Sequence, residues 1–313
     1  MTVKEWFIDF AKGSSLGIGL LPGVSAGTIG ITVGIYDKLI DGVNGLRKNF
    51  LQSLITLIPI GLGWVIAGVL LLFLEHKSWD YIPFIIVLLC AGLTVGGLPI
   101  LIREIKKHAL GAKDYVQMGV GFLVATSIGV LSVLAKVYNW FNVEAAFLDP
   151  NHNIWIYFVV VLVGVIAMGA CIVPGISGAM ILFIFGLYQP TLDIFMGDNS
   201  ILRNPDRLGT GLILTACLLI GIVIGLIGVS KIMRKLLDRH PAGTYNVVFG
   251  FVLGSLISMF VNNQIWDFYF VPEINVWWQW LVGGVCSVIA AAVTLFFVRK
   301  KIKADEAKAL SLE

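Results

Sequence analysis

The stretch from residue 154 to residue 192 reads IWIYFVVVLVGVIAMGACIVPGISGAMILFIFGLYQPTL and contains no Asp, Glu, Lys or Arg. A helix of roughly 20 apolar residues crosses a bilayer, so this run is long enough for two crossings. Pro174 and Gly175 interrupt it near its middle, because proline lacks an N–H and disfavours helix at the residue before it. The run therefore predicts a hairpin of two apolar segments with a broken or re-entrant helix at its tip.

The rest of the chain is similarly apolar, with further uncharged runs at 13–36, 51–74, 81–102, 115–135, 208–230, 243–266 and 274–298. The 313 residues are 58% hydrophobic and 13% charged, roughly half the charged share of a soluble domain. Unbroken apolar runs also argue against a β-barrel, whose strands alternate in polarity. We predict an all-α polytopic membrane protein.

An internal repeat organises these runs. Residues 17–41, GIGLLPGVSAGTIGITVGIYDKLID, align without a gap with residues 169–193, GACIVPGISGAMILFIFGLYQPTLD. A weaker echo pairs GLTVGGL at 92–98 with GFVLGSL at 250–256. We predict a first repeat at 1–140 with hairpin 4–40 and spans 51–74, 81–102 and 115–138, and a second repeat at 154–298 with hairpin 154–196 and spans 208–230, 243–266 and 274–298.

The distribution of basic residues predicts how the two repeats are related. Of 22 Lys and Arg residues, only Lys77, Lys136, Arg203 and Arg207 fall on one side of the predicted spans. The other side, with both termini and the basic tail at 299–313, is cytoplasmic by the positive-inside rule. The two hairpins are then entered from opposite faces, and three spans follow each. We therefore predict two inverted-topology repeats, as in many secondary transporters.

The two hairpin tips are the candidate binding site. A helix that restarts near Ser25 and near Ser177 presents free N–H groups and the positive end of its dipole, which suit an anion. Gly27 and Gly178 would let a ligand approach closely. The alternative is that both motifs are structural helix breaks, since Gly and Pro are common in transmembrane helices.

Weaker candidates lie near the ends of the spans. Arg103 either holds a phosphate at the inner surface or is a topology signal. Arg203 and Arg207 either recruit an anion or balance nearby acidic residues. The hydroxyls of Tyr36 and Tyr188 either bind a ligand or lie at an interface. Asp9 and Lys12, spaced three apart, are expected to pair with each other.

Several chemistries lack a signal. Gly175-Ile176-Ser177-Gly178 resembles the nucleophile motif of rhomboid-type intramembrane proteases, but a nucleophilic serine needs a base, and every histidine lies in a loop or at a span end. No metal-ligand cluster, P-loop or nucleotide fingerprint is present. We predict no cofactor, no metal, no nucleic-acid partner and no enzymatic activity.

With PGVSAGTIGITVGIYDKLIDGV at 22–43 and PGISGAMILFIFGLYQPTLDIF at 174–195, the chain resembles the bacterial polyprenyl-phosphate transporters of the PopT type. The resemblance covers nearly the whole chain in length, motif order and hydropathy. It implies a flippase in the bacterial plasma membrane that returns undecaprenyl phosphate from the outer to the inner leaflet for cell-envelope synthesis. It implies a headgroup site formed by Gly23, Ser25, Gly27 and Thr28 together with Gly175, Ser177 and Gly178.

Partners and alternatives follow from the same properties. Anionic lipids are expected to contact the basic tail. Driving phosphate inward against the membrane potential requires a coupling proton or ion, although the uncharged spans offer no relay. A secondary transporter or channel for a small soluble anion stays open, as does an intramembrane enzyme acting on lipid phosphate. Competition between substrates that depends on the length of the lipid tail distinguishes a lipid transporter from a carrier of small anions. Release of a reaction product distinguishes an enzyme from a transporter.

Overall fold

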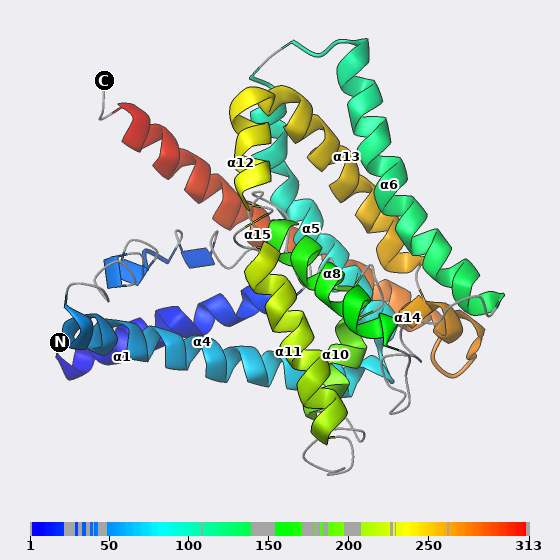
Figure 1. Cartoon of the computed structure of the whole chain (residues 1–313), viewed down its shortest axis with the longest axis horizontal. Coiled ribbons are helices and arrows are strands. Elements are labelled where there is room, and N and C mark those ends of the chain that lie inside the picture. Colours follow the sequence, from blue (N-terminus) through cyan, green and yellow to red (C-terminus); the bar gives the residue numbers. More distant parts are fainter. Residues whose placement is uncertain are drawn as a thin grey trace.

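The structure is a computed structural model that describes residues 2–21, 29–30, 33–35, 38–39, 41–42, 49–107, 109–138, 154–170, 179, 182–183, 187–196, 208–225, 228, 230–261 and 263–310. The described residues form helices and no strand, which confirms the all-helical prediction (Figure 1). In chain order the elements are α1 (Val3–Ser15), η1 (Leu16–Leu20), α4 (Phe50–Trp79), α5 (Pro83–Ile105), α6 (Ala112–Val137), α8 (Trp155–Ala170), α10 (Tyr188–Met196), α11 (Leu208–Ile224), α12 (Ser230–Arg239), α13 (Pro241–Phe260), α14 (Asn263–Trp266), η4 (Asp267–Phe270) and α15 (Trp277–Leu310).

Five segments are long and apolar enough to cross a membrane: Phe50–Trp79, Pro83–Ile105, Ala112–Val137, Pro241–Phe270 and Trp277–Lys300. Two shorter apolar helices, Trp155–Met168 and Gly209–Ile224, accompany them. A crossing needs roughly 20 residues at about 1.5 Å each. The chain is therefore a multi-pass helical membrane protein.

The starts of these helices follow from local sequence. Pro83 and Pro241 occupy the first turns of α5 and α13, where proline removes no helical hydrogen bond. At the start of α1, the Glu5 backbone N–H donates to Thr2 Oγ1 at 3.2 Å, and the Thr2 backbone N–H donates to Glu5 Oε2 at 2.7 Å. This reciprocal capping box satisfies two N–H groups that a helix start otherwise leaves unpaired.

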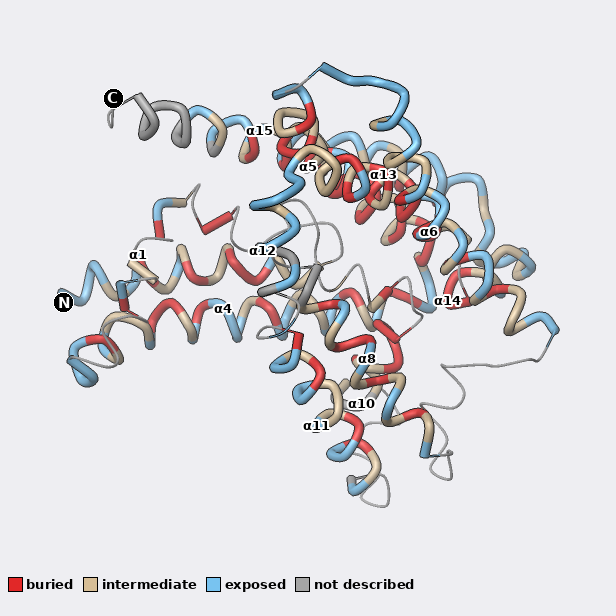
Figure 2. The backbone as a smooth tube through the Cα atoms, turned by 45° about the horizontal axis from the view of Figure 1, so that its top comes forward, coloured by how far each residue is buried: buried red, intermediate tan, exposed pale blue. Residues whose placement is uncertain are grey.

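Helices α5 and α13 form the centre of the fold. In the most apolar 18-residue stretch of each helix, 50% of the residues are buried for α5 and 44% for the segment that contains α13. The corresponding share is only 22% for α4, α6 and α15 (Figure 2). The two central helices also contact each other. A core cluster that includes Phe84, Val87, Val252 and Met259 fills the space around them. The outer helices keep most of their apolar surface available for lipid.

Each central helix packs most extensively against one outer helix, and glycine makes both contacts close. On α5, an added Cβ at Gly92 would overlap the backbone of Ser287 on α15, and one at Gly96 would lie 2.6 Å from the Ala291 carbonyl oxygen. On α13, an added Cβ at Gly250 would overlap the Met118 carbonyl of α6. Only glycine allows backbones this near, as in other tightly packed membrane helices.

Two further helix pairs lie outside this centre. Helix α1 runs along α4, and helix α8 runs along α11. Leu16 and Ile60 belong to the core cluster of the first pair, while Val160 and Leu214 belong to that of the second. Each pair therefore joins a helix that precedes a repeated motif to the helix that follows it.

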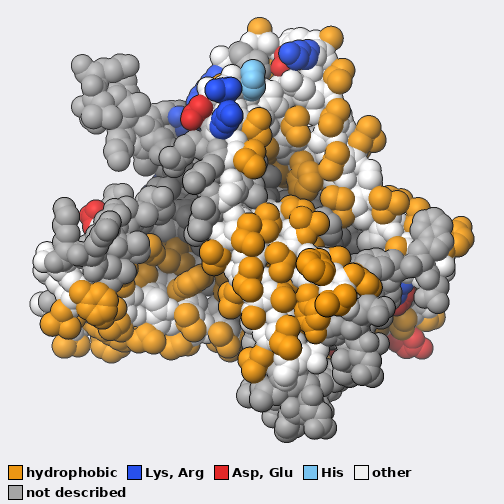
Figure 3. Space-filling model, in the orientation of Figure 1, with side chains coloured by type: hydrophobic (Ala, Val, Ile, Leu, Met, Phe, Trp, Pro, Cys, Tyr) orange, Lys and Arg blue, Asp and Glu red, His pale blue; other side chains and the backbone are white. Residues whose placement is uncertain are grey.

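The surface separates apolar from basic side chains. Hydrophobic side chains cover much of the visible face, and Lys and Arg side chains gather at the top of the view, where α5 ends and α12 meets α13 (Figure 3). Such a division is typical of a protein with a lipid-facing belt and one basic membrane surface. The exposed residues at this end include Lys106, Lys107, Lys113, Lys235, Arg239 and His240.

Candidate functional site

The motif residues predicted to bind an anion lie outside the described residues. This holds for Gly23, Ser25, Gly27 and Thr28 in the first hairpin and for Gly175, Ser177 and Gly178 in the second. It also holds for Tyr36, Arg203 and Arg207. The described residues that flank the two motifs nevertheless fix where each hairpin is anchored.

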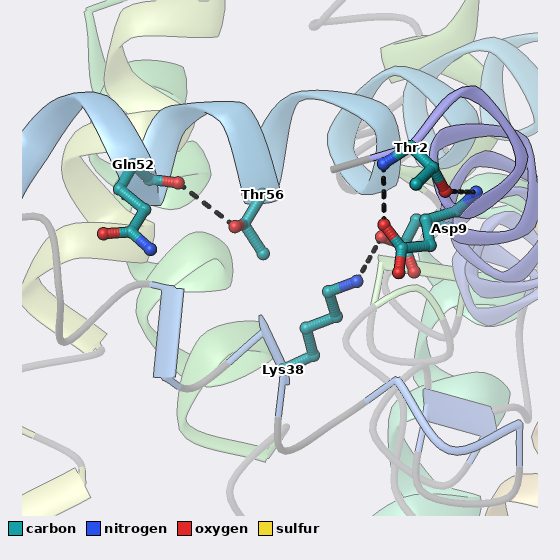
Figure 4. Close-up of polar contacts among 6 residues, drawn as sticks. Thr2, Asp9, Lys38, Gln52 and Thr56 are labelled. Atoms are coloured by element: carbon teal, nitrogen blue, oxygen red, sulfur yellow. Dashed lines mark hydrogen bonds and ion pairs between the residues drawn. The ribbon is translucent and has the colours of Figure 1, made fainter.

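An ion pair anchors the first hairpin. Asp9 on α1 is 4% exposed, and its carboxylate accepts from the ammonium of Lys38, which lies beyond the motif (Figure 4). The expected pairing of Asp9 with Lys12 is therefore wrong. Helical spacing brings Asp9 and Lys12 onto one face of α1, but the returning chain supplies Lys38 at the buried side. The pair joins α1 to the chain beyond the first motif.

Backbone conformation and packing also shape the returning limb of this hairpin. Gly34 has a φ of 67°, a left-handed conformation that favours glycine. On either side of it, Ile29 and Ile35 are 5% and 1% exposed and belong to the cluster around Ile60 of α4. The chain beyond the first motif is thus packed against α4.

The second hairpin is anchored by aromatic packing. Tyr188, at the start of α10, is 4% exposed, and its ring centroid lies 6.1 Å from that of Phe183. Phe183 in turn meets Trp79 of α4 edge to face, with centroids 5.7 Å apart. Among the described residues, the Tyr188 hydroxyl has no hydrogen-bond partner. This accessory candidate therefore lies in the core with an unsatisfied polar atom.

A chain of polar side chains joins α10 to the C-terminal end of α4. Gln189 Nε2 donates to Glu75 Oε1 at 2.7 Å, and Gln189 Oε1 lies 3.2 Å from His76 Nδ1. His76 Nε2 lies 3.4 Å from Asp193 Oδ1. Glu75 is 9% exposed and Gln189 is 5% exposed. The side chains of His76 and Asp193 are 12% and 27% exposed. This polar network therefore extends from the core toward the surface.

Sequence reasoning missed this network. The predicted span 51–74 ends before the first charged residue and therefore leaves out Glu75 and His76. Helix α4 continues to Trp79 and buries Glu75. The partner, Gln189, lies 114 residues further along the chain. A signal was present, because Asp41 and Asp193 recur at the same place in the two motif copies.

At the opposite end of the central helices, Arg103 lies half-buried in the last turn of α5. Near the same end of the molecule, a polar contact joins α13 to α6. Asn246 of α13 is 0% exposed, and its Nδ2 donates to Asp114 Oδ1 at 2.7 Å and to Gln117 Oε1 at 3.1 Å. This contact ties the starts of α6 and α13 together. Within the described part of the chain, no three His, Cys, Asp or Glu side chains form a metal-binding group.

Comparison with known proteins relates most of the chain to one family. A family model described as "VCA0040-like: Undecaprenyl phosphate translocase-like" matches residues 18–271. A polyprenyl-phosphate transporter of Staphylococcus aureus (strain NCTC 8325 / PS 47) is 29% identical over 300 residues, which cover 93% of this chain and 97% of the relative. A polyprenyl-phosphate transporter of Vibrio cholerae serotype O1 is 26% identical over 325 residues, with 93% and 96% coverage. No solved structure matches the chain significantly.

Proposed function

Because the chain belongs to the undecaprenyl phosphate translocase-like family, we propose that it transports undecaprenyl phosphate or a related polyprenyl phosphate from the outer to the inner leaflet of a bacterial plasma membrane. The similarity to two polyprenyl-phosphate transporters over 93% of the chain carries this proposal. The proposed cycle breaks no covalent bond, so the chain acts as a transporter and not as an enzyme.

The headgroup is the part of the substrate that needs the protein. A phosphate monoester carries between one and two negative charges near neutral pH, and its transfer into hydrocarbon without compensating hydrogen bonds is very costly. In our proposal, N–H groups and hydroxyls at the two hairpin tips replace the water of the headgroup, while the polyprenyl tail stays in lipid. The residues that form this site are Gly23, Ser25, Gly27, Thr28, Gly175, Ser177 and Gly178.

The pattern of helix contacts supports two inverted repeats. In the proposed first repeat the three spans are α4, α5 and α6, and in the second they are α11, α13 and α15. The second span of each repeat packs on the third span of the other, α5 on α15 and α13 on α6. Exchanging the two repeats leaves this set of contacts unchanged, as a two-fold relation between them requires.

Glycine positions support the same relation. Gly92 and Gly96 of α5 recur as Gly250 and Gly254 of α13 in the motif echo. All four face the backbone of a third span: Gly92 and Gly96 face α15, and Gly250 and Gly254 face α6. Transporters of this plan move one half against the other around a central site. We propose alternating access of this kind here, with both hairpin tips at the centre and with each closely packed pair, α5 with α15 and α13 with α6, moving as a unit.

The basic surface sets the proposed orientation, with both termini in the cytoplasm. A hollow of about 760 Å³ at the end of α15 is lined by apolar and basic residues. It suits an anionic lipid, whose acyl chains would lie against the apolar residues and whose headgroup would lie against the basic ones. Its lining residues are Ala292, Leu295, Phe296, Arg299, Lys300, Ile302 and Lys303.

Leaflet exchange in proteoliposomes tests the site. We expect the Ser25→Ala/Ser177→Ala double variant to lose most exchange of undecaprenyl phosphate, because both tips lose a hydroxyl that contacts the headgroup. Ser127→Ala is the matched control, since Ser127 is exposed on α6 and its hydroxyl donates to the Leu123 carbonyl. Exchange at the wild-type rate in the double variant would remove the hairpin tips as the headgroup site.

A further inference from the structure

Two buried acidic side chains differ in their partners. Asp9 is paired with the ammonium of Lys38. Within the part of the chain that the structure describes, Glu75 accepts one hydrogen bond, from the neutral amide of Gln189, and its Oε2 has no partner. Buried carboxylates are normally paired with a cation or coordinate a metal. Glu75 therefore lies in an environment that suits a carboxylic acid and not a carboxylate.

The groups around Glu75 do not change this conclusion. From α10 it faces Gln189 and the Tyr188 hydroxyl, and from α5 it faces the Cys90 thiol. On its own helix the neighbouring His76 is turned toward Gln189 and Asp193. Among the described side chains, none within hydrogen-bonding distance of the Glu75 carboxyl is a lysine or arginine. A proton on the carboxyl removes the charge, whereas an ionised carboxyl would remain uncompensated.

The same contacts hold the second hairpin in place. Helix α10 lies against the end of α4 (Figure 1), and Gln189 bridges Glu75 and His76. Asp193 is the second acidic group of this network. Ionisation of Glu75 would place a second negative charge in the network and would draw water toward the buried carboxyl. Both effects oppose the docking of α10 on α4.

We propose that Glu75 is a proton-binding site whose protonation is linked to the docking of the second hairpin on α4 and, through the hairpin, to the binding of the lipid phosphate. This inference rests on the proposed function, because it takes the second hairpin to carry half of the headgroup site. Undocking exposes the carboxyl, and its proton leaves to water at the edge of the network where Asp193 lies. Redocking requires a proton from that same water.

Linkage makes the proposal quantitative. If the phosphate binds preferentially to the docked arrangement, lipid binding must take up a proton, and protonation must tighten lipid binding by the same factor. Inward transport of phosphate against the membrane potential requires a coupling proton or ion, and in this proposal Glu75 binds that proton.

Proton uptake on lipid binding tests the linkage. The detergent-solubilised full-length protein is mixed with undecaprenyl phosphate in weak buffer with a pH-indicator dye at pH 8, about two units above the second pKa of a phosphate monoester. We expect the wild type to take up protons as it binds the lipid, up to about one per bound lipid, because the lipid-free protein at this pH includes undocked molecules in which Glu75 is ionised. Glu75→Gln should bind the lipid without uptake, because its amide keeps the hydrogen bond but does not titrate.

Three variants make the outcome specific. Glu104→Gln is the matched control, since Glu104 pairs with Lys107 at the other end of the central helices, and it should take up protons like the wild type. His76→Gln should do the same, because the proton resides on Glu75. Proton uptake that is lost in His76→Gln but kept in Glu75→Gln would show that His76 binds the proton. This result would overturn the assignment of the proton site to Glu75. The elution profile and melting temperature of Glu75→Gln show whether the variant is folded, and Glu75→Leu, which has a similar size and does not titrate, replaces it if not.

The pH dependence of the Kd is the second readout. At pH values where the phosphate no longer titrates and Glu75 is ionised in the undocked protein, the wild-type Kd should rise about tenfold per pH unit, while the Glu75→Gln Kd should stay nearly constant. Equal uptake and equal pH dependence in wild type and Glu75→Gln would overturn this inference and leave the proposed function standing. A wild type that fails to bind the lipid would remove the proposed function, and this inference with it.

Discussion

The contact between α13 and α6 and the contact between α10 and α4 hold the molecule together in different ways. The first brings two backbones together at Gly250, with no room for a side chain. The second depends on the amide of Gln189, which reaches a buried carboxyl at 2.7 Å. Close backbone packing resists any relative movement, whereas a polar contact can be exchanged for water at a modest net cost. The comparison identifies the paired central helices as scaffold and α10 as the element that can move.

The largest effect is expected from filling the close backbone contact. Gly250→Ala should lower the free energy of unfolding by about 3 kcal/mol, the upper end of the range for overpacking, because the new methyl overlaps the Met118 carbonyl. Gly92→Ala should cost a similar amount against Ser287. Reversible thermal or denaturant unfolding in detergent measures both.

Gly119→Ala is the matched control for these two variants. Gly119 lies on α6 with nothing within 4 Å of an added Cβ, so alanine should be neutral or stabilising by up to about 1 kcal/mol. Equal stability losses in Gly119→Ala and Gly250→Ala would contradict the view that close packing distinguishes the scaffold.

A smaller and more local effect is expected at the polar contact. Gln189→Leu removes the amide that bridges Glu75 and His76 and should cost about 1–3 kcal/mol, because the buried Glu75 carboxyl and the part-buried His76 ring each lose a partner. Amide hydrogen exchange should accelerate in α10, Tyr188–Met196, and stay unchanged in α13. Gln52→Leu, at an exposed position on α4, controls for the change in side chain. Uniform acceleration in both helices would mean that α10 does not move independently.

The smallest effect is expected where a polar contact is exposed. Lys136 Nζ lies 2.7 Å from Asp267 Oδ2, but the aspartate side chain is 66% exposed, and solvent screens such pairs. Asp267→Asn should therefore cost less than about 1 kcal/mol, and the difference should shrink as salt is added. Unfolding measured at low and high ionic strength checks this. A loss as large as that of Gln189→Leu would show that burial is not what distinguishes the two polar contacts.

The sequence predicted the helical elements better than their partners. The apolar runs identified the long helices, because hydrophobic length is a property of each segment by itself. The echo at 92–98 and 250–256 also pairs Gly92 with Gly250, and both lie in close helix contacts. It could not indicate that α5 packs on α15 or that α13 packs on α6, since these contacts join residues more than 100 positions apart and depend on the shapes of both helices.

The site was predicted less completely for the same reason. The repeated motifs drew attention to Ser25 and Ser177, which lie outside the described residues. Glu75 escaped notice because a charge normally ends an apolar run. Its burial depends on Gln189 and Tyr188 from the other repeat, and no local pattern around residue 75 contains that information. Asp9 was recognised as part of an ion pair, but its partner, Lys38, comes from the far limb of the hairpin.

The central claim is that the chain moves a polyprenyl lipid by its phosphate. The most direct measurement is the rate of leaflet exchange in proteoliposomes of wild-type protein, comparing undecaprenyl phosphate with neutral undecaprenol and adding inorganic phosphate or a short-chain prenyl phosphate as competitor. Our account predicts exchange of undecaprenyl phosphate, little exchange of undecaprenol, and competition that strengthens with tail length. Exchange of both lipids at one rate would indicate nonspecific scrambling. Transport of inorganic phosphate with no exchange of the lipid would contradict the account and favour a carrier of small soluble anions.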